Sequence, residues 1–347
     1  MSETAAPVER LAAPPAWANR LFASRLAPLV VGPDGEVGVW SIAGDKSRST
    51  ITDQFTANAG EYHARYSASA HFQNLINQAF LQTGLQPPET PVILDLGSGS
   101  GVNSIVPCFN LFPGARQVAT DLSAELLTIL AAYAVETGVA DRVVCVVMDA
   151  MSEHVSPGQF DLVTGASILH HLLEPARGMA AAARALKPGG HAIFIEPFDG
   201  YGLIRLAYER ILAEADLRRR PWRRHPLDPQ VDAVLRDMIS DIAGRTMPDF
   251  NRPGFADMDD KWLFSRERIE ILARRSGFSA VSFVPHNDHD SLYRDMAAVQ
   301  LRLATGLDTL TLPDWALTIM DDFDRALPPP VKRLLMLEGS IVLTKAA

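Results

Sequence analysis

The stretch VILDLGSGSG, residues 92–101, decides the fold class of this 347-residue chain. A short run of strand type leads directly into three alternating glycines, Gly97, Gly99 and Gly101. Glycine lets a backbone turn tightly and approach a ligand closely, and the amides at the start of the following helix then face that ligand. The spacing is G-x-G-x-G with Asp95 on the strand, whereas dinucleotide enzymes use G-x-G-x-x-G. The pattern therefore favours a ligand with a cationic amino acid portion over a pyrophosphate.

Short β-branched runs alternate with segments of helix length on the C-terminal side of this stretch. The runs are QVATD (117–121), VVCVVMD (143–149), FDLVTGA (160–166) and HAIFIEP (191–197), followed after a gap by FSAVSFVPH (278–286) and SIVLTKA (340–346). Strands that alternate with helices predict a parallel sheet with helices on both faces, the doubly wound α/β class. Each connection is long enough for a right-handed crossover.

Four segments are predicted along the chain. Residues 1–50 form an N-terminal extension, in which LVVGPDGEVGVW indicates a β-hairpin. Residues 51–197 hold a leading helix and the ligand-binding core, and residues 198–262 form a helical insertion. Residues 263–347 complete the core around a second helical insertion at about 287–338.

Composition and charge exclude several classes of protein. Apolar residues make up 47% of the chain, which is far from the composition of disorder. The net charge of −9 argues against a nucleic-acid-binding role. No stretch of 18 apolar residues and no signal peptide is evident, and the two cysteines, Cys108 and Cys145, are typical of buried thiols in a reducing compartment. We therefore expect a cytoplasmic protein that binds neither nucleic acid nor a membrane.

Aspartates stand at the ends of the second and third predicted strands. Asp121 closes QVATD twenty residues beyond Gly101, where a doubly wound nucleotide site places an acid for ribose hydroxyls, and Asp149 closes the next strand. A lone strand-end aspartate is more often a helix cap or turn former. Together with Asp95 these acids mark three successive strands at the edge where such sheets bind ligands.

With these motifs the chain resembles the class I S-adenosyl-L-methionine (SAM)-dependent methyltransferase superfamily, from about 90 to 197. GASILHHL followed by ALKPGGHAIFIEP looks like its ubiquinone/menaquinone-biosynthesis branch. The resemblance implies a Rossmann-like seven-stranded sheet with the last strand antiparallel beside the fifth, SAM as cofactor and S-adenosyl-L-homocysteine as product. It also implies helical lid insertions that bind the acceptor. The cofactor-binding residues that it implies are Asp95, Gly97, Ser98, Gly99, Gly101 and Ser167 for the methionine portion, Asp121 with Leu122 for the ribose, and Asp149, Ala150 and Met151 for the adenine.

The fourth strand ends in GASILHHL and lacks the Asn/Asp-Pro-Pro-Tyr/Phe sequence that the family uses for amino groups on bases or glutamine side chains. We therefore expect methyl transfer to an oxygen or carbon atom of a small metabolite in a biosynthetic pathway. An N-methyltransferase acting on a small amine stays open, as does a protein that binds SAM without transferring methyl. A nicotinamide oxidoreductase is disfavoured by the glycine spacing.

Three residues are candidates for catalysis. His170 or His171, just beyond the fourth strand, is a candidate general base, because histidine exchanges protons near neutral pH. If both lie on one helix, only one can face the site, because neighbours differ by about 100°. A hydrogen-bonding role at a helix start is the alternative for these histidines. Glu196 ends the fifth strand and either orients the acceptor or forms a structural salt bridge.

Four residues are candidates for substrate contact. Tyr62 and Tyr66 share one helical face, where they contact substrate or pack on each other. His286 and His289, in PHNDHD, are expected to make polar contacts to substrate. No metal is expected there, because adjacent loop donors need a distant third ligand. The Arg-rich run LRRRPWRRHP (217–226) either binds an anionic group of the acceptor or a carrier protein, or is a solvated face. A homodimer is an open alternative.

Overall fold

The structure, a computed structural model, describes residues 14–31, 36–43, 55–67, 70–219, 226–246, 248, 251, 253–286, 289–307 and 309–347. The chain divides into two compact units. We call the first the sheet unit; it comprises Met1–Glu196, Glu267–Val284 and Ser340–Ala347. We call the second the helical unit; it comprises Pro197–Arg266 and Pro285–Gly339.

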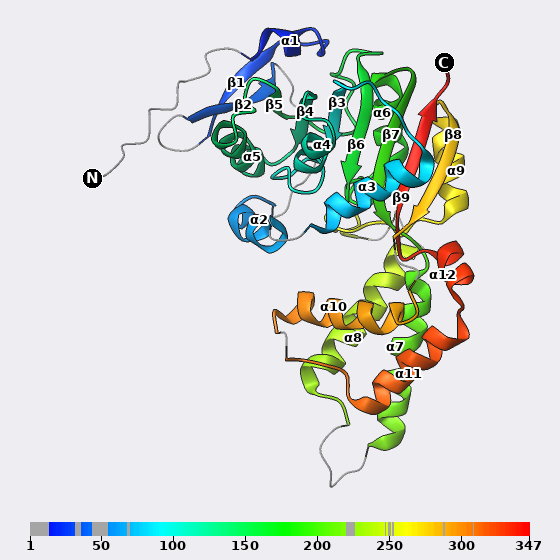
Figure 1. Ribbon diagram of the computed structural model, residues 1–347. Helices are drawn as coiled ribbons and strands as arrows, with labels where there is room; N and C mark the ends of the chain where they lie inside the picture. Colours follow the sequence, from blue (N-terminus) through cyan, green and yellow to red (C-terminus); the bar gives the residue numbers. More distant parts are fainter. Residues whose placement is uncertain are drawn as a thin grey trace. The chain divides into compact units, whose positions relative to one another are not determined.

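One sheet of nine strands forms the centre of the sheet unit, in the order β1-β2-β5-β4-β3-β6-β7-β9-β8 (Figure 1). The strands are β1 (Leu26–Val31), β2 (Glu36–Ile42), β3 (Val92–Leu96), β4 (Arg116–Asp121), β5 (Val143–Val147), β6 (Phe160–Ala166), β7 (Leu186–Pro197), β8 (Phe278–Pro285) and β9 (Glu338–Lys345). The five strands from β5 to β7 in this order are parallel. The predicted doubly wound α/β class is therefore confirmed.

The last strand, β9, lies between β7 and β8. The Gly189 N–H donates to the Ala346 carbonyl over 3.1 Å, and two residues further along β7 the Nδ1 atom of His191 lies 3.2 Å from Thr344 Oγ1. Partner numbers fall along β9 as they rise along β7, so the two strands are antiparallel. This is the placement beside the fifth core strand that the resemblance implied.

The expected strand number of seven is wrong, because the N-terminal hairpin joins the sheet. β1 pairs antiparallel with β2, and β2 pairs parallel with β5, with Val39 opposite Cys145. Val39 and Trp40 are both buried. The turn of the hairpin, at 32–35, lies outside the described residues. The hairpin covers an edge of β5 that would otherwise present unpaired backbone groups.

The sheet unit also contains helices, some of which pack on these strands through small apolar clusters. They are α1 (Ala16–Asn19), α2 (Ala59–Ser67), α3 (His71–Thr83), α4 (Ile105–Leu111), α5 (Ala124–Glu136), α6 (Pro175–Ala185) and α9 (Arg266–Arg275). Leu127 and Leu130 of α5 pack with Ala119 of β4 and Cys145 of β5. The Ser123 hydroxyl accepts from Leu126 N–H and caps α5, which fixes where the chain leaves β4.

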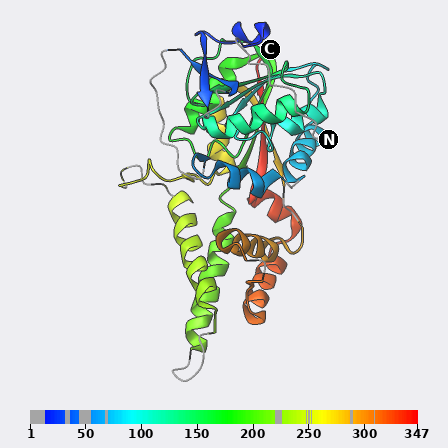
Figure 2. The same ribbon diagram turned by 90° about the vertical axis from the view of Figure 1, so that its left-hand side faces the viewer.

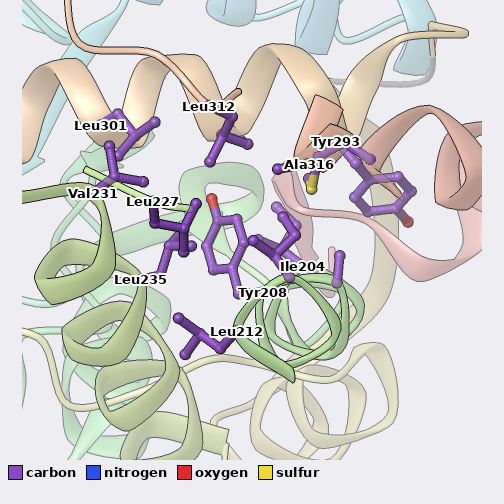
Figure 3. Packing of buried hydrophobic residues seen from close by; sticks show 14 of the residues in the cluster. Ile204, Tyr208, Leu212, Leu227, Val231, Leu235, Tyr293, Leu301, Leu312 and Ala316 are labelled. Atoms are coloured by element: carbon purple, nitrogen blue, oxygen red, sulfur yellow. The ribbon is translucent and has the colours of Figure 1, made fainter. Parts of the chain in front are cut away.

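The helical unit has its own apolar core. Its helices are α7 (Tyr201–Arg218), α8 (Pro229–Thr246), α10 (Leu292–Thr305), α11 (Asp314–Ala326) and α12 (Pro329–Leu335). Figures 1 and 2 show α7 and α8 side by side. The ring of Tyr208 on α7 lies among Leu227, Leu301 and Leu312 in the core (Figure 3). No described helix is long and apolar enough to cross a membrane.

A buried ion pair joins three parts of the helical unit. The Lys332 ammonium of α12 lies 2.8 Å from Asp324 Oδ1 of α11, and it also donates to the His289 and Asp290 carbonyls. The Asp324 carboxylate accepts from two N–H groups in the first turn of α10, including that of Tyr293. Both side chains are almost completely buried, and every charge in the pair has a hydrogen-bonding partner.

Candidate functional site

The three glycines after β3 serve different purposes. Gly97, Gly99 and Gly101 have φ values of +69°, +51° and +82°, in the left-handed region that favours glycine. A Cβ atom on Gly97 would lie 2.6 Å from Ile168 Cδ1, and one on Gly101 would lie 2.5 Å from Leu130 Cδ1. A Cβ atom on Gly99 would meet nothing closer than 3.8 Å. Packing therefore requires Gly97 and Gly101, whereas at Gly99 a Cβ atom would make only an ordinary contact with Leu126.

The buried carboxylate of Asp95 fixes the glycine turn through hydrogen bonds. It is fully buried and accepts from the Ser104 hydroxyl over 2.5 Å and from the Thr164 hydroxyl over 2.6 Å. Burial raises the pKa of Asp95 to about 6, against the hydrogen bonds, which lower it. The Ser98 N–H donates to the Thr120 carbonyl over 2.8 Å and joins the same turn to β4. These contacts fix the turn between β3, β4 and β6.

Asp121 lies next to the open side of this turn. Its Oδ2 atom accepts from the Gly99 N–H over 2.8 Å, and its Oδ1 atom accepts from the Ser123 N–H over 2.8 Å. Burial raises the pKa of Asp121, and its backbone hydrogen bonds act in the opposite direction. Leu122 adds a third backbone hydrogen bond. An ionised carboxylate can accept about four, so room is left for a hydroxyl donor of a ligand. Leu122, the next residue, is also partly exposed.

The ends of β5 and β6 form two more turns at this edge. The Asp149 carboxylate accepts from the Met151 N–H over 2.8 Å, while Asp149 and Ala150 are buried and Met151 is partly exposed. Ser167 follows β6 with a φ of +60°, an uncommon conformation for a residue other than glycine. Because β3, β4, β5 and β6 are parallel, their carboxyl ends meet at one edge of the sheet. The structure therefore brings the predicted cofactor residues together.

Glu196 organises the turn that carries the two histidines. Its carboxylate accepts from the backbone N–H groups of Ile168, Leu169 and His170, and its Oε2 atom lies 2.6 Å from His170 Nδ1. Glu196 is 1% exposed and His170 is 6% exposed. His170 and His171 lie in a turn and not on a helix, so the helical-spacing argument does not apply. Their rings face each other, with centroids 4.1 Å apart.

Aromatic side chains extend from the histidines to α2. Phe55 contacts His171 edge-on, with ring centroids 5.8 Å apart, and contacts Tyr62 at 5.2 Å. Tyr62 and Tyr66 have ring centroids 4.9 Å apart. The tyrosines thus pack on each other, as the alternative interpretation of their spacing held, while staying partly exposed. A role of either tyrosine in substrate binding stays a prediction.

Four residues that the sequence did not mark as candidates make contacts at this edge. The Phe55 carbonyl accepts from the Ser123 hydroxyl over 2.5 Å, and His63 Nδ1 lies 2.9 Å from Ser100 Oγ in the glycine turn. Phe55 precedes Tyr62 by seven residues, and this spacing was the available signal for an aromatic face. Nothing in the local sequence indicates that His63 reaches Ser100, because the two residues are 37 positions apart.

Two predicted substrate residues, His286 and His289, belong to the helical unit. The His286 N–H donates to the Glu338 carbonyl over 3.1 Å, and His289 Nε2 lies 3.0 Å from Asp295 Oδ2 in an exposed pair. All the other site candidates belong to the sheet unit. Most of the Arg-rich run, 220–225, lies outside the described residues.

A comparison with protein families matches residues 94–194 to a methyltransferase domain. The match covers less than a third of the chain. An uncharacterized protein of Synechococcus is 32% identical over 184 residues, which are 53% of this chain and 41% of the relative. The ubiquinone biosynthesis O-methyltransferase of Paracidovorax citrulli is 35% identical over 114 residues, which are 32% of this chain and 45% of the relative. The matched region thus spans less than half of these curated relatives.

Solved structures give the methyltransferase fold further support. A chain in the complex between the Haloferax volcanii Trm112 methyltransferase activator and a methyltransferase has a TM-score of 0.50 and 15% identity. The comparison covers 86% of this chain and 100% of that chain. At this identity the likeness concerns the fold alone.

The residues at the methyltransferase domain's sheet edge fit SAM, the cofactor that such a domain implies. Asp121 is a partly exposed residue whose carboxylate is fixed by backbone N–H groups, as a contact to ribose hydroxyls requires, and Gly99 beside it has room for a Cβ atom. Two buried oxygen atoms, Asn103 Oδ1 and Ser152 Oγ, have no hydrogen-bond partner among the described residues. They follow the turns after β3 and β5, where donors of an amino acid portion and an adenine could satisfy them.

Proposed function

We propose that this protein is a SAM-dependent methyltransferase that transfers a methyl group to an oxygen or carbon atom of a small metabolite in a biosynthetic pathway. One observation carries the proposal. The Asp121 carboxylate is fixed by the Gly99 N–H at 2.8 Å, at the one glycine of the turn where a Cβ atom would meet nothing closer than 3.8 Å. This arrangement lies within the segment that matches a methyltransferase domain.

In this proposal each turn at the carboxyl ends of β3, β4 and β5 binds a different part of the cofactor. The cofactor, when bound, supplies a methyl group on a positively charged sulfur. Asp121 accepts hydrogen bonds from the ribose hydroxyls, and the turn after β5 borders the adenine. The glycine turn contacts the methionine portion. Because the methyl group is already activated, the protein mainly positions the acceptor and accepts its proton.

The choice of an oxygen or carbon acceptor rests on two observations. The turn after β6 carries Ser167-Ile-Leu-His-His in place of the sequence that the family uses for amino groups. Relatives matching the same domain are named ubiquinone biosynthesis O-methyltransferases, although they cover only about 30% of this chain. A cytoplasmic location and a homodimer are further proposals, which rest on the sequence alone.

Binding of S-adenosylhomocysteine to Asp121→Asn tests the cofactor site. Loss of hydrogen bonds to a charged group costs about 1.5–3 kcal/mol, so calorimetry should show an affinity about 10–150 times weaker. Asp161→Asn is the matched control, because Asp161 also accepts a backbone N–H, that of Val92, but at the opposite end of the parallel strands. Equal affinities of wild type and Asp121→Asn would place the cofactor elsewhere.

Product formation tests the acceptor. The full chain is incubated with SAM and, separately, with catechol, acetoacetate and benzylamine as oxygen, carbon and nitrogen probes, and S-adenosylhomocysteine is measured by mass spectrometry. We expect turnover with catechol or acetoacetate above the acceptor-free rate. Turnover with benzylamine alone would overturn the assignment of the acceptor atom. Tight SAM binding without transfer to any of a broader set of acceptors would favour a protein that binds SAM without using it.

A further inference from the structure

We propose that Glu196 and His170 are positioning residues that hold His171 as the proton acceptor of the methyl transfer. The inference rests on the proposed function and assigns roles within its site. The Glu196 carboxylate accepts an unusual number of hydrogen bonds. Three successive backbone N–H groups, from Ile168 to His170, and the His170 ring all point at this one carboxylate.

This arrangement fixes the conformation of the turn and the tautomer of His170. The two oxygens of Glu196 can only accept, so the hydrogen between them and the His170 ring resides on Nδ1. The 2.6 Å separation from Oε2 is that of a short, charge-assisted hydrogen bond. His170 is 6% exposed and its Nδ1 hydrogen is committed to Glu196. The hydrogen bond leaves His170 Nε2 as its only proton-accepting atom, and the burial of His170 separates it from an acceptor more than the burial of His171 does.

His171 is placed differently. It is partly exposed, and its ring lies between two others: that of His170 at 4.1 Å and that of Phe55 at 5.8 Å. The tilt of 41° towards His170 and the edge-on contact with Phe55 restrict how the His171 ring can rotate. A general base must lie within hydrogen-bonding reach of the proton that it accepts, so a ring with restricted rotation suits this role.

Contacts on both sides of His171 join the turn after β6 to the turns after β3 and β4. The Ile168 side chain occupies the space that a Cβ atom of Gly97 would enter. On the other side, Phe55 contacts the His171 ring while its carbonyl accepts from Ser123, two residues after Asp121. His171 is therefore tied to the turns after β3 and β4, where the proposed cofactor contacts lie.

The proton transfer balances for a hydroxyl acceptor. The hydroxyl proton passes to the unprotonated ring nitrogen of His171, and the oxygen keeps the electron pair of the O–H bond. An oxygen electron pair forms the new bond to the methyl carbon, and the electron pair of the broken carbon–sulfur bond stays on sulfur. The positive charge of the cofactor is thereby moved to His171, and the proton then leaves to water.

Imidazole NMR on the full chain, labelled with ¹⁵N-histidine and saturated with S-adenosylhomocysteine, tests the positioning without an acceptor. We expect a downfield Nδ1 proton from His170 that is lost in Glu196→Gln, together with a shift of the His171 ring signals. His191, five residues before Glu196 on β7, is the internal reference and should not change. His171 signals that are the same in Glu196→Gln and wild type would overturn the proposal. If Glu196→Gln does not fold, the wild-type spectrum alone tests the proposal. A wild-type spectrum without the downfield His170 proton would then overturn it.

Kinetics of His171→Gln test the proton acceptor, with whichever of catechol or acetoacetate is turned over. We expect the rate of S-adenosylhomocysteine formation to fall about 10²–10⁴-fold. The affinity for S-adenosylhomocysteine should stay within about threefold, and the control His191→Gln should keep its rate. A His171→Gln rate within threefold of wild type would overturn this inference while the proposed function stands. Failure of wild type to bind S-adenosylhomocysteine would instead contradict the proposed function.

Discussion

Alanine at Gly99 and at Gly101 should damage different properties of the protein. Both glycines have positive φ values, and a residue with a Cβ atom in that region costs about 1–2 kcal/mol. At Gly101 the Cβ atom would also lie 2.5 Å from Leu130 Cδ1 and 3.3 Å from Ile105 Cβ, and such overpacking costs a further ~1–3 kcal/mol. At Gly99 no atom lies closer than 3.8 Å.

Gly101→Ala should therefore be less stable than Gly99→Ala by about 2 kcal/mol. For a domain of roughly 150–250 residues, this corresponds to a melting temperature about 4–8 °C lower. Cofactor binding should follow the opposite order. Gly99→Ala places a methyl group where the ligand approaches the backbone, so we expect its affinity for S-adenosylhomocysteine to fall at least about tenfold, or ~1.4 kcal/mol.

Differential scanning calorimetry measures the melting temperatures, and isothermal titration at a temperature where both variants are folded measures the affinities. Gly101→Ala should bind within about threefold of wild type. Two results would contradict these assignments of Gly99 and Gly101. Equal melting temperatures would mean that Leu130 and Ile105 relax without cost, and wild-type affinity in Gly99→Ala would mean that the ligand does not use this side of the turn.

Two further predictions concern stability. The pKa of Asp95 is raised to about 6, above its ordinary 3.8, so the folded state binds its proton more tightly than the unfolded chain does. Its contribution to stability should then fall by about 3 kcal/mol as pH rises from about 4 to 6, a change that Asp95→Asn should remove in urea unfolding experiments. In the helical unit, Lys332→Met leaves the buried Asp324 charge unpaired and should cost about 3–5 kcal/mol. The double variant with Asp324→Leu should be more stable than Lys332→Met, and the reverse order in urea unfolding would show that the pair is not coupled.

Local sequence predicted the glycine turn and the core strands because their signals are local. Gly97, Gly99 and Gly101 follow a run of strand type, and all three have the positive φ values that only glycine adopts without strain. Asp121 is the last residue of β4, and Asp149 follows the end of β5 by two residues, so both lie at the same edge of the sheet. For these positions, strand order and parallel direction were enough to bring distant residues together.

Long-range pairing was not visible in the sequence. The hairpin pattern predicted β1 and β2, but nothing near Val39 indicates that it pairs with Cys145 and extends the sheet to nine strands. Likewise Glu196 and His170 were each placed at the rim, while the hydrogen bond between them depends on the register of β6 and β7. The helical unit follows no strand pattern, so its helices were expected only as insertions.

Titration of the wild-type chain with SAM, S-adenosylhomocysteine and NADH distinguishes a methyltransferase cofactor site from a nicotinamide site. We expect saturable, micromolar binding of the first two ligands in isothermal calorimetry and no heat of binding with NADH. Binding of NADH in preference to SAM would contradict this expectation, because the glycine turn and Asp121 would then belong to a nicotinamide site.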